Sequence, residues 1–152
     1  MNRGFTLLEI MVVVAIVLIL STGGVLAIGD RIEKNAIIRA KTEIPTFIRN
    51  AIDKSFSDGV KRTVEVNTTG GAIIIKNTSP TSIELYEIGK PLTIIMTPNK
   101  FDIGEKGEVT GLGAATQAAI MVRTRKGSKN VVRVEVSNIS GLNLGRVNVI
   151  KY

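Results

Sequence analysis

The feature that most constrains the fold is an apolar run near the N-terminus. It follows the short basic segment Met1-Asn2-Arg3-Gly4, extends from Phe5 to Ile28 and carries one charge, Glu9. As an α-helix this run would be about 36 Å long at ~1.5 Å per residue, enough to cross a hydrocarbon core of roughly 30 Å. A short positive segment stays on the cytoplasmic side of a membrane. The sequence therefore predicts a single-pass membrane helix over residues 5–28, with the rest of the chain outside the cytoplasm.

A second helical segment follows the apolar run. Apolar residues recur at spacings of three and four between residues 30 and 56, which predicts an amphipathic helix. Two glycines within residues 21–24 predict a bend or local unwinding before it, and Pro45 predicts a kink or short break near residues 43–46. Asp58-Gly59 is a suitable C-terminal stop. The apolar stripe expected to face the core consists of Ile37, Ala40, Ile44, Phe47, Ile48, Ala51, Ile52 and Phe56.

Beyond residue 60 the apolar period changes from helical to alternating, with Gly or Pro between most segments. This pattern predicts strands over residues 64–66, 72–75, 82–88, 92–96, 119–124, 131–136 and 146–150. Residues 104–116 are rich in Gly and Ala and are expected to form a mobile loop. The predicted fold class is α+β: a long N-terminal helix whose amphipathic half packs on an antiparallel β domain of two sheets. The predicted divisions are a leader at 1–4, a membrane helix at 5–28 and an extracytoplasmic domain at 29–152.

Composition narrows the chemistry that the chain can perform. Hydrophobic residues make up 44% of the chain, but Cys and His are absent. Thiol nucleophiles, Ser-His-Asp triads and the usual zinc sites are therefore excluded. We expect no enzyme activity and no cofactor. A secreted enzyme cut after Val25-Leu26-Ala27 by a signal peptidase is an alternative, disfavoured by Glu9 and by the length of the apolar run.

Glu9 and its surroundings carry the functional prediction. A carboxylate inside a membrane-spanning stretch costs about 2.5–3.5 kcal/mol and is usually retained for a positive partner. A hydrated carboxylate near the cytoplasmic face is the simpler alternative. The segment Gly4-Phe5-Thr6-Leu7-Leu8-Glu9 resembles the leader junction of type IV prepilins and of the pseudopilins of type II secretion and DNA uptake.

This resemblance implies how the chain is matured and assembled. A prepilin peptidase would cut between Gly4 and Phe5, and Phe5 would become N-methylated. Glu9 would compensate the amine of a neighbouring subunit while the apolar helices form the filament core. Phe5 and Glu9 are four residues apart and so lie on one side of a helix. The implied partners are the peptidase, other pilin or pseudopilin subunits, the inner-membrane assembly platform and the cytoplasmic membrane itself.

The C-terminal region has a weaker similarity. Residues 141–147 before the last predicted strand, together with the order of a long helix and then strands, resemble minor pseudopilins of the GspH/FimT kind. Members of the family often have a proline in the first half of the helix, where this chain has Thr22-Gly23-Gly24. The subunit is therefore expected to be a minor one, in either a secretion pseudopilus or a pilus.

Two further groups of residues are candidate sites. The formal net charge is +7, and basic residues gather where two predicted strands meet in a hairpin. Such a basic tip could contact phosphates, as in a DNA-uptake pilin, although no aromatic side chains are present to stack on bases. Asp102, Glu105 and Glu108 offer oxygen ligands for calcium, although their spacing fits no EF-hand and a solvated acidic turn is the simpler interpretation. The basic residues are Arg123, Arg125, Lys126, Lys129 and Arg133.

Overall fold

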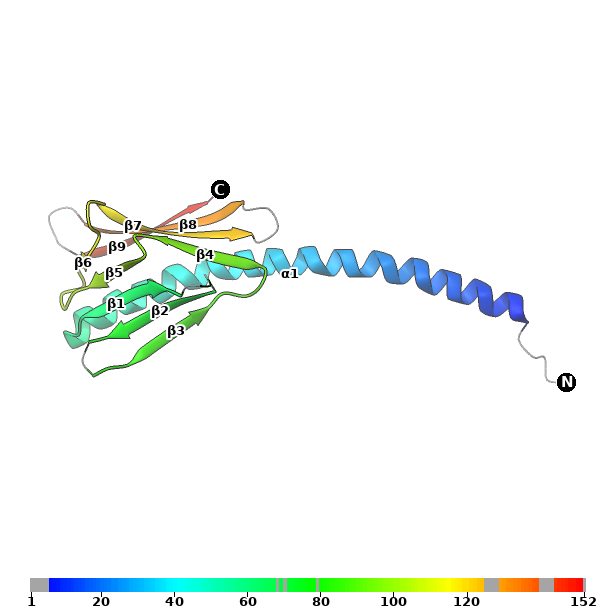
Figure 1. The fold of residues 1–152 in the computed structure, drawn as a ribbon, viewed down its shortest axis with the longest axis horizontal. Helices are drawn as coiled ribbons and strands as arrows, with labels where there is room; N and C mark the ends of the chain where they lie inside the picture. The colour runs from blue at the N-terminus through cyan, green and yellow to red at the C-terminus, as the bar shows by residue number, and fades with distance from the viewer. Residues whose placement is uncertain are drawn as a thin grey trace. The chain divides into compact units, whose positions relative to one another are not determined.

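The computed structural model describes residues 6–67, 69, 71–78, 80–124, 129–139 and 144–151, with residues 22–27 and 151 described by their backbone alone. One α-helix and nine β-strands form the described part of the chain (Figure 1). The chain divides into two compact units, Met1–Lys34 and Asn35–Tyr152. The long helix contributes to both units, and every strand belongs to the second. The α+β class predicted from the sequence is confirmed.

Helix α1, Leu7–Asp58, ends where the sequence predicts. Gly59 has a positive φ of 65° and donates its N–H to the Ser55 carbonyl over 3.0 Å, which closes the last turn. The local unwinding expected near residues 21–24 and the short break expected near residues 43–46 are absent, since all of these residues lie in continuous α-helix. Glycine lowers helix propensity by only about 1 kcal/mol, which neighbouring turns offset.

Pro45 is retained in the helix because it lies in the core. Its side chain is buried next to Ile44, which is fully buried. A proline removes one backbone hydrogen bond, but the packing of this face holds the helix together around it. The hydroxyl of Thr46 also donates to the Thr42 carbonyl over 2.8 Å in the same turn. The helix therefore has no break at residues 43–46, because burial of this face outweighs the lost hydrogen bond, and the kink expected there stays a prediction.

Two antiparallel sheets follow the helix. The five-stranded sheet has the order β3-β2-β1-β5-β6, and the four-stranded sheet has the order β4-β7-β8-β9. All seven predicted strands are present. Two strands were not predicted, β5 and β6, because they are short and gain their regularity from pairing with β1 and with each other. The strand bounds are β1 Arg62–Val66, β2 Ala72–Asn77, β3 Ile83–Glu87, β4 Leu92–Thr97, β5 Lys100–Ile103, β6 Val109–Thr110, β7 Gln117–Thr124, β8 Asn130–Asn138 and β9 Gly145–Lys151.

The second half of α1 supplies one wall of the core, as its apolar spacing predicts. Its buried side chains share one cluster with the inner faces of both sheets. Phe56 is an exception, since 64% of it is exposed. In this last turn Ser55 is the residue that faces inward, where its hydroxyl accepts a hydrogen bond from Arg62. The helix residues in the cluster are Ala40, Ile44, Ile48, Ala51 and Ile52.

Polar contacts fix α1 to strand β3 on one side. Lys54 and Glu84 form an ion pair at 2.7 Å, and the Tyr86 hydroxyl donates to the Glu43 carboxylate over 2.9 Å. The rings of Phe47 and Tyr86 are 5.6 Å apart between centroids, within the range of favourable aromatic pairs. Strand β3 is therefore anchored to the helix by the side chains of its inner face.

On its other side α1 contacts β9 and the turn before β6. Arg49 donates a hydrogen bond to the Val147 carbonyl over 3.2 Å, and the Gly145 N–H donates to the Gly107 carbonyl over 2.9 Å. A Cβ at Gly145 would lie 2.8 Å from that carbonyl oxygen and 2.9 Å from Ile52 Cδ1. Only glycine fits this close approach. Residues 104–116, expected to be a mobile loop, thus include β6 and a turn packed against the helix.

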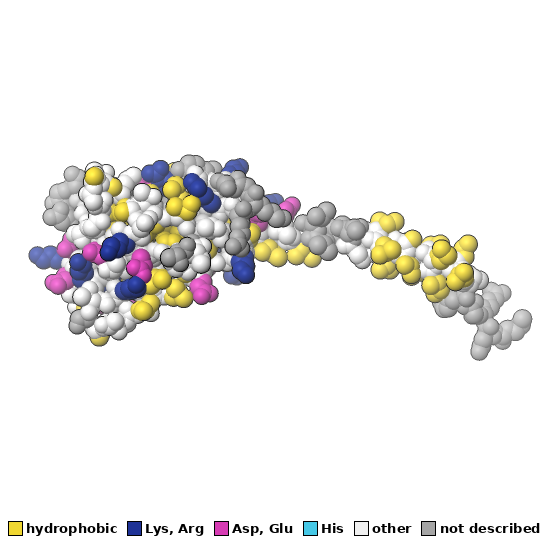
Figure 2. Space-filling view, viewed as in Figure 1, with side chains coloured by type: hydrophobic (Ala, Val, Ile, Leu, Met, Phe, Trp, Pro, Cys, Tyr) yellow, Lys and Arg dark blue, Asp and Glu magenta, His cyan; other side chains and the backbone are white. Residues whose placement is uncertain are grey.

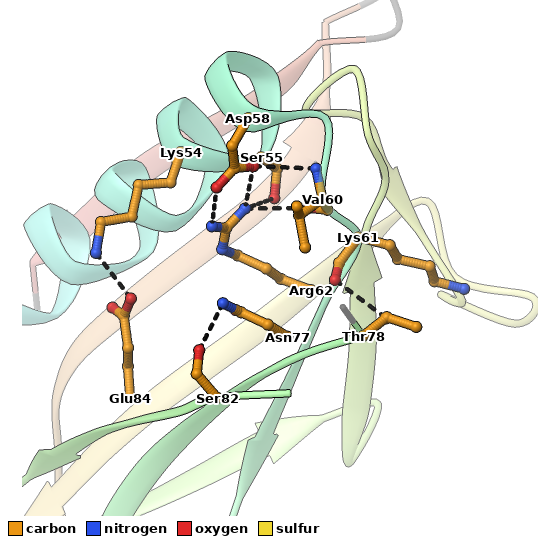
Figure 3. A network of polar contacts seen from close by, with 10 residues as sticks. All are labelled: Lys54, Ser55, Asp58, Val60, Lys61, Arg62, Asn77, Thr78, Ser82 and Glu84. Carbon is orange, nitrogen blue, oxygen red and sulfur yellow. Dashed lines mark hydrogen bonds and ion pairs between the residues drawn. The ribbon is translucent and has the colours of Figure 1, made fainter. Parts of the chain in front are cut away.

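A buried arginine links the end of α1 to β1 (Figure 3). Arg62 is 2% exposed and donates to the Asp58 carboxylate at 2.5 Å, to the Ser55 hydroxyl at 3.0 Å and to the Val60 carbonyl at 3.0 Å. These acceptors compensate much of the cost of burying the guanidinium. The network was not predicted, because the sequence alone does not show that Arg62 is buried.

Acid is expected to weaken this junction. The hydrogen bond from Arg62 lowers the pKa of Asp58 from 3.8 to about 2. Because the folded-state pKa is the lower one, the contribution of Asp58 to stability is present above the unfolded-state pKa and is lost as the pH falls towards 2. We expect Asp58→Asn to lower the melting temperature at neutral pH and to flatten its dependence on pH between about 4 and 2. Circular dichroism melts across this range test the prediction, and equal acid sensitivity of both proteins would contradict it.

Candidate functional site

The start of α1 is built around Thr6 and Glu9. The Glu9 carboxylate accepts hydrogen bonds from the Thr6 N–H at 2.9 Å and from the Thr6 hydroxyl at 3.1 Å. The Glu9 N–H donates to the Thr6 hydroxyl over 3.3 Å. This reciprocal arrangement is a capping box, which satisfies N–H groups that the first turn of a helix leaves unpaired. In a single chain, Glu9 therefore already has partners within its own helix.

Sequence analysis missed this capping box, although the signal was available. Thr6-Leu7-Leu8-Glu9 has the spacing of threonine and glutamate that defines the motif before an apolar run. The carboxylate also lies in the first turn, where the helix dipole favours a negative charge. Gly4 and Phe5, the residues predicted for cleavage and methylation, lie outside the described residues.

From Leu7 to Leu20, helix α1 exposes apolar side chains on every face. Leu7 is 82% exposed, and Ile19 and Leu20 are each 71% exposed. Hydrophobic side chains cover this part of the helix in Figure 2. A helix that is apolar all round is normally buried by lipid or by other protein chains. This surface is the candidate assembly surface, defined by Leu7, Leu8, Ile10, Met11, Val12, Val13, Val14, Ile16, Val17, Leu18, Ile19 and Leu20.

The sequence predicts that residues 5–28 of this helix span a membrane. In the part of the chain that the structure describes, no helix is both long enough and apolar enough to cross a membrane. The single-pass span is not confirmed and stays a prediction.

The basic hairpin is formed by β7 and β8, which pair antiparallel. Arg123 donates from Nε to the Asn130 side chain over 2.7 Å, and Arg133 pairs with Glu135 at 2.9 Å. Lys129 is exposed. Arg125 and Lys126 lie outside the described residues. The ion pair with Glu135 reduces the positive charge that Arg133 offers to a phosphate, whereas Arg123 keeps its full charge because Asn130 is neutral.

The three acidic residues considered as calcium ligands do not come together into a metal site. Asp102 accepts from the Thr63 hydroxyl at 2.7 Å and pairs with Lys61 at 3.1 Å. Burial opposes ionisation of Asp102, but these two hydrogen bonds outweigh burial and hold its pKa below the usual value. Glu108 accepts from the Lys106 N–H over 2.9 Å. Among the described residues no three acidic side chains, including those of Asp102, Glu105 and Glu108, gather into a group that could hold a metal ion.

Residues 1–25 match the family model described as the prokaryotic N-terminal methylation motif, which is the signature of type IV pilins and pseudopilins. The match covers the first 25 of the 152 residues of the chain. No curated protein and no solved structure matches the chain.

Proposed function

We propose that this chain is a structural subunit, and a minor one, of a type II secretion pseudopilus or a type IV pilus. The observation that carries the proposal is the methylation motif at residues 1–25. In the proposed precursor the N-terminal helix is held in the cytoplasmic membrane, and residues 29–152 lie outside the cytoplasm. The inner-membrane assembly platform then transfers the matured subunit into a filament.

The capped helix start supports a specific role for Glu9. After cleavage between Gly4 and Phe5, the new amine would lie one residue before Thr6, close to the capping box. Glu9 would then exchange its local partners for the amine of a neighbouring subunit, in a setting without water where an ion pair is strong. The exposed apolar side chains of the candidate assembly surface would be covered by neighbouring helices.

Gly4→Glu tests the processing step. A bulky charged side chain at the scissile bond is expected to block the peptidase and leave the leader on at least about nine in ten molecules, since cleavage requires close approach to the backbone there. Mass spectrometry of the purified protein measures the retained leader, and Gly4→Ala serves as the conservative control. Normal cleavage of Gly4→Glu would contradict the proposed cleavage position.

A DNA-uptake pilin is the second candidate. Its support is the net charge of +7 and the exposed Lys129 beside the hairpin. The ion pair of Arg133 with Glu135 weighs against it, because that pair neutralises one of the positive charges of the hairpin. Binding of duplex DNA that weakens as salt is raised, and that is lost in Lys129→Glu, would favour this candidate over a purely structural role.

A further inference from the structure

Strand β3 forms one edge of the five-stranded sheet, and its open side presents backbone groups. It pairs antiparallel with β2. A backbone hydrogen bond of 2.9 Å lies at each end of the pair: Asn77 N–H donates to the Ser82 carbonyl, and Ile88 N–H donates to the Gly71 carbonyl. In antiparallel pairing alternate residues direct their backbone groups to opposite sides. Residues 82, 84, 86 and 88 therefore face β2. The N–H and C=O groups of Ile83, Leu85 and Glu87 point to the open side, where no backbone hydrogen bond within the described part of the chain reaches them.

The side chains of this edge are apolar and exposed. Ile83 is 65% exposed and Leu85 is 53% exposed, and both lie on the outer face of the sheet together with Glu87. Proteins normally protect such an edge with a lysine, a proline, a bulge or a covering loop. Strand β3 contains neither lysine nor proline, and its register with β2 is unbroken from residue 83 to residue 87. An unprotected, regular and apolar edge of this kind is a template for another strand.

The inner face of β3 holds this edge rigid. Glu84 is tied to Lys54, and the hydroxyl of Tyr86 is bonded to Glu43 on helix α1. At the start of the strand the Asn77 side chain donates to the Ser82 hydroxyl over 2.7 Å (Figure 3). A strand fixed in this way loses little conformational freedom when a partner binds.

The charges on β3 identify the chemistry of its partner. Its charged residues are both acidic, in a chain of net charge +7. Glu84 is neutralised by Lys54, whereas Glu87 is exposed on the face that carries Ile83 and Leu85. A strand added antiparallel would place aliphatic side chains opposite Ile83 and Leu85 and would be favoured by a cation opposite Glu87.

We propose that β3 is a docking edge for an extended segment of another protein, in which aliphatic side chains alternate with polar ones and a lysine or arginine lies opposite Glu87. A second copy of this chain fits the edge less well. Two β3 strands paired antiparallel about Leu85 would place each Glu87 opposite Ile83, where no cation would face the carboxylate. The basic edge strand β9 already uses its Gly145 N–H and Val147 carbonyl in contacts with Gly107 and Arg49.

A designed peptide tests the proposal on the full-length chain in detergent micelles. The probe is a fluorescently labelled peptide with the sequence Lys-Thr-Val-Thr-Val, whose lysine lies opposite Glu87 in antiparallel register. We expect saturable binding, with slower amide hydrogen exchange at Leu85. Leu85→Lys and Glu87→Lys should each weaken binding by about tenfold. Ile150→Lys, at an exposed isoleucine of β9, is the matched control and should bind as the unchanged protein does.

A charge exchange separates docking from a general effect on folding. A peptide with glutamate in place of its lysine should bind Glu87→Lys better than it binds the unchanged protein. Recovery of binding in this pair supports docking at β3, because a merely misfolded variant would bind neither peptide. The proposal is overturned if the lysine peptide binds Glu87→Lys undiminished, if Leu85 exchange is unchanged at saturation, or if the chain without peptide forms dimers that Leu85→Lys separates.

Discussion

Glu9→Val is expected to be inserted and cleaved normally yet to be recovered in sheared filaments at less than about a tenth of the unchanged level. Removing the carboxylate eliminates a charge that costs about 2.5–3.5 kcal/mol in an apolar layer, so insertion should not suffer. Assembly should suffer, because the amine of the neighbouring subunit would lose its negative partner in a setting where an unpaired charge is costly. Mass spectrometry measures leader removal, and immunoblotting of the sheared fraction measures incorporation.

The capping box provides controls that distinguish the two roles of Glu9. Glu9→Gln keeps a side chain suited to the capping box but removes the charge, whereas Thr6→Ala keeps the charge and removes the cap. Loss of a cap costs about 0.5–2 kcal/mol of helix stability. If the ion pair governs assembly, Glu9→Gln should be as defective as Glu9→Val, and Thr6→Ala should assemble nearly normally. If Thr6→Ala assembles poorly and Glu9→Gln assembles nearly normally, Glu9 acts only as a helix cap.

Ile48→Asp is expected to unfold the domain or to lower its melting temperature by more than about 12 °C. Ile48 is fully buried between α1 and the sheets, among apolar side chains. A carboxylate there would be unpaired, and such a change costs about 4 kcal/mol or more from a total stability of about 5–15 kcal/mol. For a domain of this size each kcal/mol corresponds to about 3–6 °C.

The measurement uses the fragment 29–152, which we expect to fold without the apolar half of the helix. Ile38→Asp is the matched control, because Ile38 lies on the same helix but is 61% exposed. Ile38→Asp should change the free energy of unfolding by no more than about 0.5 kcal/mol. Thermal melts followed by circular dichroism give both values. Similar melting temperatures for Ile48→Asp and the unchanged fragment would place the buried stripe on a different face of the helix.

The methylation motif and the main elements of the fold could be predicted because their signals are local. The junction at Gly4 and Phe5 and the run of apolar residues after it are contiguous in the sequence. The end of α1 follows from Gly59, whose φ is positive. The alternating segments predicted seven of the nine strands, and the spacing of Ile44, Ile48 and their neighbours identified the buried face of the helix.

The sequence by itself determined the methylation motif, the end of the long helix and the face that the helix buries, because each depends on residues close together in the chain. The tertiary structure decided which side chains are left unsatisfied or become paired. It buried Arg62, left Phe56 exposed, gave Arg123 and Arg133 partners on the sheet and placed β3 at an open edge. It also kept Pro45 within the helix. These outcomes depend on contacts between residues far apart in the chain, whose packing free energy exceeds the local preferences that a sequence pattern reports.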